Sequence, residues 1–129
     1  MAARHILIAD DDILFREGLE TVLDEYFTVW TSDAGPEAVA LVDGLAPDVV
    51  LVNPESKGLE AARQIKARHP LTRVILLSVY DRYLTAALDV GADGYLLKGC
   101  PTEELVAAIN RPAGVAEPGS SKGGMSIEP

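Results

Sequence analysis

The chain has 129 residues, of which 48% are hydrophobic, and this is enough apolar material for one compact domain. Its formal net charge of −9 argues against a protein that grips nucleic acid through phosphate contacts by itself. A single cysteine, Cys100, excludes an internal disulfide framework and fits a cytoplasmic location, and no apolar stretch is long enough to span a membrane.

Short apolar segments alternate with segments of helical periodicity along the chain. The predicted strands are residues 5–9, 28–31, 48–52, 74–77 and 95–97. The predicted helices are residues 14–26, 36–45, 59–69, 82–90 and 102–110. Asp12 is placed to cap the first helix, Pro36 to occupy the first turn of the second, and Gly91 to end the fourth.

This alternation predicts an α/β fold, a doubly wound (βα)5 sandwich around a five-stranded parallel sheet, formed by residues 1–111. Residues 112–129 are rich in Pro, Gly and Ser and lack a periodic apolar face. We interpret them as a flexible linker or disordered tail.

Polar residues follow the predicted strands at the points where ligands bind in such sheets. Asp10 and Asp11 come after the first strand, Asn53 after the third, Ser78 after the fourth and Lys98 after the fifth. Clustered carboxylates usually hold a hard cation such as Mg²⁺, and a hydroxyl beside a lysine suits a phosphoryl group.

Five stretches carry a family resemblance: HILIADDDILFREGLETVL, GPEAVALV, PDVVLV, VILLS and ALDVGADGYLLKGCPTEELVAAI. Over about residues 4–110 the chain resembles the receiver domain of bacterial two-component response regulators, a signalling domain with a flavodoxin-like (CheY-like) fold. The first and last stretches are most similar to the NarL/FixJ class, whose receivers usually precede a helix-turn-helix DNA-binding domain.

The resemblance implies a role for each polar residue at the strand ends. Asp10 and Asp11 match the acidic pair that holds Mg²⁺ in the family. Ser78 and Lys98 match the residues that contact the phosphoryl group. Tyr95 matches the aromatic switch residue that turns inward on activation.

Asn53 stands where the family has its phosphoacceptor aspartate. An amide is a poor nucleophile, so Asn53 cannot become an acyl phosphate. Its NH₂ group can instead donate to Asp10 or Asp11 and relieve their repulsion without a metal. We therefore expect that no cofactor is required and that Mg²⁺ binding at Asp10 and Asp11 is weak or lost.

The loop after Asn53 departs from the family as well. Pro54 has no N–H, which closes the usual route by which Asn53 would deamidate to aspartate. The segment NPESKG is about three residues shorter than the family's loop. Glu55 and Ser56 are either substitute site residues or members of an exposed loop.

The main hypothesis is an atypical (pseudo-)receiver, not an enzyme, that signals by phosphorylation-independent contacts. The resemblance implies an interaction face built from the fourth helix, fifth strand and fifth helix, and we expect a homodimer through it. Its candidate residues are Arg82, Tyr83, Ala87, Tyr95 and Lys98. Transcription would be controlled by a DNA-binding domain absent from this chain, which favours a fragment of a longer regulator over a stand-alone protein.

Two alternatives stay open. The vacated acidic pocket would let the domain sense a small molecule. A haloacid-dehalogenase-like phosphatase would use the D-x-D pattern of Asp10 and Asp12, although Leu14 occupies the position where that family usually has Thr or Val.

Overall fold

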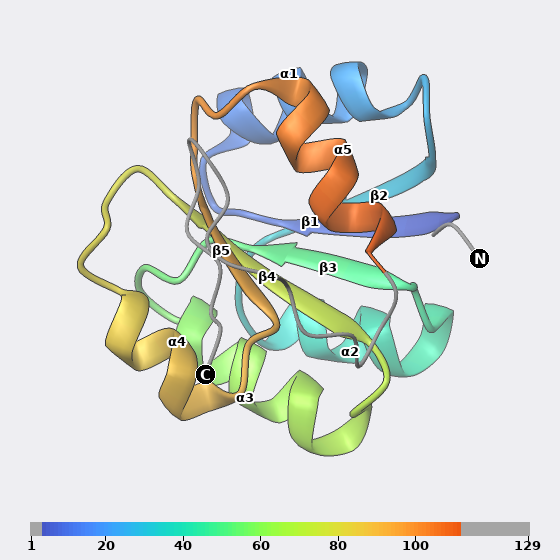
Figure 1. Ribbon diagram of the computed structural model, residues 1–129. Helices are drawn as coiled ribbons and strands as arrows, with labels where there is room; N and C mark the ends of the chain where they lie inside the picture. The colour runs from blue at the N-terminus through green and yellow to red at the C-terminus, as the bar shows by residue number, and fades with distance from the viewer. Residues whose placement is uncertain (1–3, 112–129) are drawn as a thin grey trace.

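The computed structural model describes residues 4–111 as an alternation of strands and helices (Figure 1). The strands are β1 (His5–Ala9), β2 (Thr28–Ser32), β3 (Val49–Val52), β4 (Arg73–Ser78) and β5 (Gly94–Leu97). The helices are α1 (Ile13–Leu23), α2 (Pro36–Leu45), α3 (Gly58–Arg68), α4 (Leu84–Val90) and α5 (Thr102–Asn110). The predicted order is confirmed, and the predicted linker at 112–129 lies outside the described residues.

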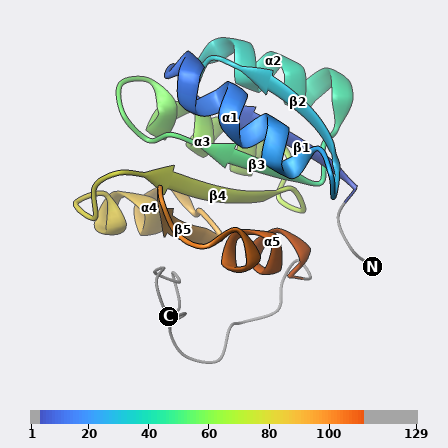
Figure 2. The same cartoon turned by 90° about the horizontal axis from the view of Figure 1, so that it is seen from above.

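The strands form one parallel sheet in the order β2-β1-β3-β4-β5. Helices α1 and α5 cover one face, and α2, α3 and α4 cover the other (Figures 1 and 2). This confirms the predicted flavodoxin-like α/β class. Successive parallel strands are joined by crossover connections, and the helices of these connections pack on the two faces of the sheet.

Two hydrophobic cores lie on the two faces of the sheet. In β1, Ile6 and Ile8 belong to the core under α1 and α5, whereas Leu7 and Ala9 belong to the core over α2, α3 and α4. Alternation of side chains along a strand explains why the strand is apolar throughout. Each large apolar side chain buried in this way stabilises the fold by about 1.5–3 kcal/mol.

The predicted helix-end signals act as expected. The Asp12 Oδ1 accepts a hydrogen bond from the backbone N–H of Phe15 at 3.1 Å and caps α1. Pro36 occupies the first turn of α2, and Gly91 ends α4 with a positive φ of 79°. Helix α4 begins at Leu84, two residues later than the predicted segment, because the preceding residues form a loop fastened to β5.

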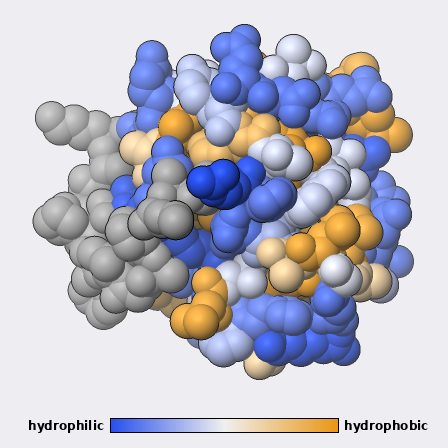
Figure 3. Space-filling view, turned by 90° about the vertical axis from the view of Figure 1, so that its right-hand side faces the viewer, coloured by the Kyte–Doolittle hydropathy of each residue, from blue (hydrophilic) through white to orange (hydrophobic). Residues whose placement is uncertain are grey.

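The face that carries the amino ends of the strands shows separate apolar patches between hydrophilic areas (Figure 3). Within residues 4–111, no helix is long and apolar enough to cross a membrane.

The sheet order places a ligand crevice at one end of the sheet. The chain leaves β1 for β2 on one side and returns to β3 on the other, so the strand order reverses between β1 and β3. In open α/β sheets such a switch point opens a crevice beyond the carboxyl ends of the two strands. The residues directly after β1 and β3 are Asp10 and Asn53.

Candidate functional site

The sheet brings the predicted site residues together by extending its hydrogen-bond ladder past the strand ends. The Asn53 N–H donates to the Ala9 carbonyl at 2.9 Å, and the Lys98 N–H donates to the Ser78 carbonyl at 2.7 Å. Each polar residue is thus held by the strand that neighbours its own. Asp10, Asn53, Ser78 and Lys98 consequently lie at one edge of the sheet, as predicted.

Asp10 is the centre of the site and is only 2% exposed. Its Oδ1 accepts from the backbone N–H of Asp12 at 2.8 Å and from Asn53 Nδ2 at 3.1 Å. Its Oδ2 lies 2.8 Å from Lys98 Nζ, whose side chain is also buried. The negative charge of Asp10 is therefore matched by one cation and two neutral donors, as a buried charge requires.

Lys98 is fixed from a second side by an aromatic ring. Its Nζ lies 4.1 Å from the centre of the Phe15 ring on α1, within the range of a cation–π contact. Phe15 was not singled out from the sequence. Its position three residues after Asp12, the last of the three aspartates, gave no signal beyond helical periodicity.

Asn53 bridges Asp10 and the loop that follows β3. Its Nδ2 donates to Asp10, while its Oδ1 accepts from the backbone N–H of Glu55 at 3.1 Å. The prediction that the amide would donate to one of the two aspartates is confirmed, and the acceptor is Asp10. An aspartate at position 53 would place a carboxylate oxygen, an acceptor, where this donor now lies.

Asp11 ties the loop between β2 and α2 to the site. Its Oδ1 accepts from the backbone N–H of Ala34 at 2.8 Å. Arg16 supports the same region, because its Nη1 donates both to the Asp10 carbonyl and to Asp33 Oδ1, each at 3.1 Å. The two aspartates therefore have different roles. Asp10 is buried and forms an ion pair with Lys98, whereas Asp11 is exposed and accepts a hydrogen bond from the backbone of Ala34.

This arrangement does not fit a magnesium ion. Both oxygens of Asp10 already have donors, and one oxygen of Asp11 holds the Ala34 N–H. Across the described part of the chain, no three His, Cys, Asp or Glu side chains are grouped to hold a metal ion. A cation would first have to displace Lys98 or the Asn53 amide from Asp10.

The shortened loop depends on Gly58, the first residue of α3. A Cβ added at Gly58 would lie 1.7 Å from the carbonyl oxygen of Asn53, far inside any allowed contact. Ser56 adopts a positive φ of 57°, which is uncommon for a residue with a side chain. The chain thus enters α3 directly from the site, and only glycine permits that approach.

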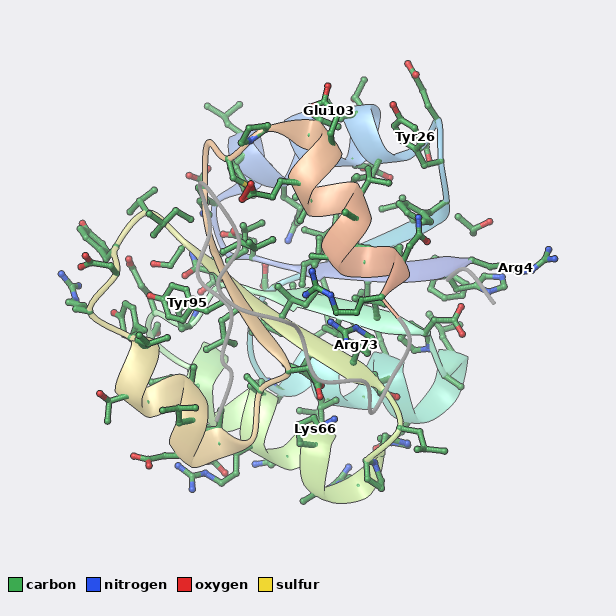
Figure 4. All side chains as sticks on the ribbon, viewed as in Figure 1. Arg4, Tyr26, Lys66, Arg73, Tyr95 and Glu103 are labelled. Carbon is green, nitrogen blue, oxygen red and sulfur yellow. The ribbon has the colours of Figure 1, made fainter. Side chains whose placement is uncertain are left out.

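Tyr95 fastens the loop between β4 and α4 to β5 (Figure 4). Its hydroxyl donates to the Tyr80 carbonyl and accepts from the Tyr83 N–H at 3.2 Å. Ser78 is fully buried, and its Oγ accepts from the Tyr80 N–H at 3.0 Å. Burial raises the pKa of the Tyr95 phenol, so its proton is held for the bond to Tyr80.

The predicted interaction face is wrong for three of its five residues. Ala87 and Tyr95 are completely buried in the core over α2, α3 and α4. Lys98 points inward to Asp10. Arg82 is exposed and stacks on the Tyr80 ring, with its Cζ 3.9 Å from the ring centre, and Tyr83 is half-buried.

A cavity of about 360 Å³ lies beside Asn53. Its lining includes Asp11, Glu55, Ser56 and Tyr80. Glu55 and Ser56, the two loop residues named as substitute site residues, thus border the site. Three exposed or half-exposed carboxylates, those of Asp11, Asp12 and Glu55, make the lining acidic.

Comparisons with known proteins agree on one family. The model of the response regulator receiver domain matches residues 6–110. The transcriptional regulatory protein YdfI of Bacillus subtilis (strain 168) is 40% identical over 108 residues, which cover 78% of this chain and 50% of that protein. The transcriptional regulatory protein DegU of Brevibacillus brevis is 39% identical over 112 residues, covering 81% and 48%. The chain therefore spans about half the length of these curated relatives.

Solved structures share the fold. A DNA-binding response regulator of the LuxR family from Staphylococcus aureus superposes with a TM-score of 0.74 at 25% identity, covering 82% of this chain and 95% of that chain. A CheY-like receiver domain protein from Methanospirillum hungatei JF-1 gives a TM-score of 0.75 at 23% identity, covering 84% and 91%. The second likeness bears on the fold alone.

Proposed function

Because the chain belongs to the response regulator receiver domain family, we propose that it is an atypical receiver that signals through protein contacts without phosphorylation at position 53. Membership of the receiver domain family argues against the alternative hypothesis of a haloacid-dehalogenase-like phosphatase.

The observation that carries the proposal is the hydrogen bond from Asn53 Nδ2 to Asp10 Oδ1. The position that the family uses for its nucleophile holds a donor that compensates a neighbouring carboxylate. An amide cannot take the phosphoryl group as an acyl phosphate. Together with Lys98, it compensates the charge of Asp10 without added ions.

The position of Tyr95 supports an active-like conformation that the sequence stabilises without phosphorylation. The resemblance implies that this aromatic residue turns inward on activation, and here it is buried with both hydroxyl bonds made to the loop before α4. Only a differential interaction shifts a two-state equilibrium. In this chain, the loop contacts of Tyr95 supply such an interaction in place of a phosphoryl group.

The output of the domain would be a homodimer and a transcriptional response. The proposed dimer face of α4, β5 and α5 retains Arg82 and Tyr83, and it adds Leu88, which is 54% exposed. The relatives are named transcriptional regulatory proteins, and the matched segment covers about half of their length. A DNA-binding domain joined to this receiver would bind the DNA, since the acidic receiver itself would repel it.

The cavity beside Asn53 favours a second candidate function, the sensing of a small molecule. Its volume of about 360 Å³ falls in the range of ligand pockets. A ligand there would contact Tyr80 and Glu55, and so would reach the loop that Tyr95 holds.

The test is phosphorylation with a small donor. The chain is incubated with acetyl phosphate and Mg²⁺, and its intact mass is measured over time, with Asn53→Asp treated in parallel as the matched control. We expect no stable phosphoryl adduct on the chain and an adduct on the variant. A stable adduct on the unaltered chain, placed by fragmentation at any carboxylate of the site, would overturn the proposal.

A further inference from the structure

Strand β2 forms one edge of the five-stranded sheet, and within residues 4–111 its neighbour in the sheet is β1. Figure 2 shows β2 and β5 on opposite sides of the sheet. An edge strand presents a row of main-chain N–H and C=O groups that can pair with a further strand. Whether it does so depends on which groups point outward and on what surrounds them.

Two hydrogen bonds show which side of β2 is occupied by β1. The Thr28 N–H donates to the Arg4 carbonyl at 2.8 Å, and the Ser32 carbonyl accepts from the Asp10 N–H at 2.9 Å. Both ends of β2 are therefore fastened to β1 through residues that are four positions apart in the strand. Residues an even number of positions apart direct their main-chain groups to the same side of a strand.

Val29 and Thr31 carry the main-chain groups that point away from the sheet. Successive residues of a strand direct these groups to alternate sides, so Trp30 faces β1 and its two neighbours face outward. The open stretch ends at Asp33, whose N–H donates to Glu37 Oε1 at 3.1 Å. An added strand would thus meet the N–H and C=O groups of both Val29 and Thr31, one donor and one acceptor from each residue.

Strand β2 lacks the features by which proteins usually block an open edge. Its sequence TVWTS contains no charged residue, proline or glycine, and it pairs with β1 residue for residue without a bulge. Val29, Trp30 and Thr31 are all partly exposed. β-branched and aromatic residues favour strand pairing, whereas charges, prolines and bulges at an edge oppose it. The edge is therefore suited to accept another strand.

The charged residues on both sides of β2 have one sign. Between residues 24 and 37 every charged residue is acidic and exposed: Asp24, Glu25, Asp33 and Glu37. Arg16 of α1 reaches this segment, but its Nη1 is paired with Asp33 at 3.1 Å. Arg4 projects outward beyond the amino end of β1 (Figure 4). A strand added to β2 would therefore have carboxylates near both of its ends.

From these observations we propose that β2 binds an extended segment of a partner protein, which joins the sheet as an additional strand. The segment would carry uncharged β-branched residues opposite β2 and Lys or Arg residues on both flanks. A second copy of this chain is a poorer occupant, because antiparallel pairing of two β2 strands would set the acids after one strand against the acids before the other. The inference goes beyond the proposed function, since it uses neither position 53 nor the face at the β5 edge of the sheet.

The test is an NMR titration of the ¹⁵N-labelled 129-residue chain with a synthetic peptide. The probe is a short run of alternating Val and Thr residues with lysines at both ends. We expect saturable shifts along β2, and hydrogen exchange of the Val29 and Thr31 amides should slow at least about tenfold at saturation. The Trp30 amide, which already faces β1, should change less. Trp30 is the one tryptophan of the chain, so its fluorescence gives an independent binding curve.

Two control peptides separate strand addition from general attraction to an acidic protein. One has the same sequence with methyl groups on the backbone nitrogens of the Val and Thr run, and so cannot donate hydrogen bonds to β2. The other carries glutamates in place of the lysines. Each should bind at least about tenfold more weakly than the probe.

Matched variants locate the binding on the edge. Thr31→Lys places a charge on β2 and should weaken the probe at least about tenfold. Thr85→Lys makes the same change of charge at an exposed position of α4 and should leave the affinity within about twofold. Thr31→Pro removes one outward N–H and no bond to β1, so it should weaken binding as well. The dispersion of each NMR spectrum checks the fold, and Thr31→Lys carries the test if the proline variant does not fold.

The inference would be overturned by the absence of saturable binding, by shifts centred on another surface, or by equal binding of the methylated peptide. Equal losses from the two lysine variants would overturn it too, since binding would then follow the net charge alone. A dimer of the chain that Thr31→Lys dissociates would assign the edge to a second copy instead. The phosphorylation test reads position 53 alone, so its failure and the failure of peptide binding are distinguishable.

Discussion

Lys98 Nζ lies 2.8 Å from Asp10 Oδ2, and the side chains of both residues are almost completely buried. This ion pair joins the ends of β5 and β1 across two intervening strands. Asn53 adds a neutral donor to the other oxygen of Asp10. The site is therefore a closed set of mutual contacts, and its members should depend on one another.

Removing the cation should leave the buried carboxylate unpaired. We expect Lys98→Met to lower the free energy of unfolding by about 3–5 kcal/mol, measured by urea denaturation monitored by circular dichroism. The double variant Asp10→Asn with Lys98→Met should recover most of the loss, because neither partner is then charged. A cost below about 1 kcal/mol for the single variant would show that Asp10 does not depend on Lys98.

Restoring a carboxylate at position 53 should make the site dependent on a cation. Asn53→Asp replaces a donor 3.1 Å from Asp10 Oδ1 by an acceptor. We expect a loss of about 1–3 kcal/mol in the free energy of unfolding without Mg²⁺, largely regained when Mg²⁺ is added. The melting temperature of the unaltered chain should change little with Mg²⁺, and Asn53→Ala should not gain a response to it. An equal Mg²⁺ response in all three proteins would contradict the compensation by Asn53.

Gly58 should tolerate no side chain. We expect Gly58→Ala to destabilise the fold by about 3 kcal/mol or more, since the added Cβ would lie 1.7 Å from the Asn53 carbonyl oxygen. Gly44→Ala, in the open part of α2, is the control and should stabilise the fold by about 0.5–1 kcal/mol through helix propensity. Chemical denaturation of both variants decides the matter. Similar stabilities for the two would mean that the loop after β3 adapts freely.

Tyr95→Phe should release the loop before α4 without opening the core. The loss of two hydroxyl hydrogen bonds should cost about 1–3 kcal/mol, and hydrogen exchange of the Tyr83 amide should accelerate. Unchanged exchange at Tyr83 would show that the hydroxyl does not hold the loop.

The same hydroxyl predicts a pH dependence at the alkaline end. Burial raises the pKa of Tyr95 above its ordinary value of about 10, so the folded state favours the protonated phenol. This contribution to stability is fully present below about pH 10 and is lost as the pH rises toward the raised pKa of the folded protein. The alkaline fall in melting temperature should therefore be shallower in Tyr95→Phe. Identical profiles for the two proteins would speak against the shift.

The fold and the membership of the site were predictable because they depend on local patterns. A run such as residues 49–52, apolar at every position, marks a strand covered on both faces. Parallel strands bring their carboxyl ends together, so Asp10, Asn53, Ser78 and Lys98 had to meet at one edge. The donation by the Asn53 amide followed from its chemistry beside two carboxylates.

The side-chain contacts within the site and the burial of individual side chains were not predictable in the same way. The sequence places Lys98 at the site, but its bond to Asp10 and its contact with Phe15 arise from packing between distant segments. Ala87 was wrongly placed on the surface because the interaction face was taken from the family resemblance, whereas α4 turns this side chain into the core. The bonds of Tyr95 depend on the path of a loop without periodicity.

The side chain of Lys98 borders both the acidic cavity beside Asn53 and a groove between α1 and α5. One residue thus lines both spaces. An occupant of either space that prefers one position of Lys98 changes the free energy of occupying the other, and the change is reciprocal. Lys98 therefore provides a physical means of thermodynamic linkage between occupation of the two spaces.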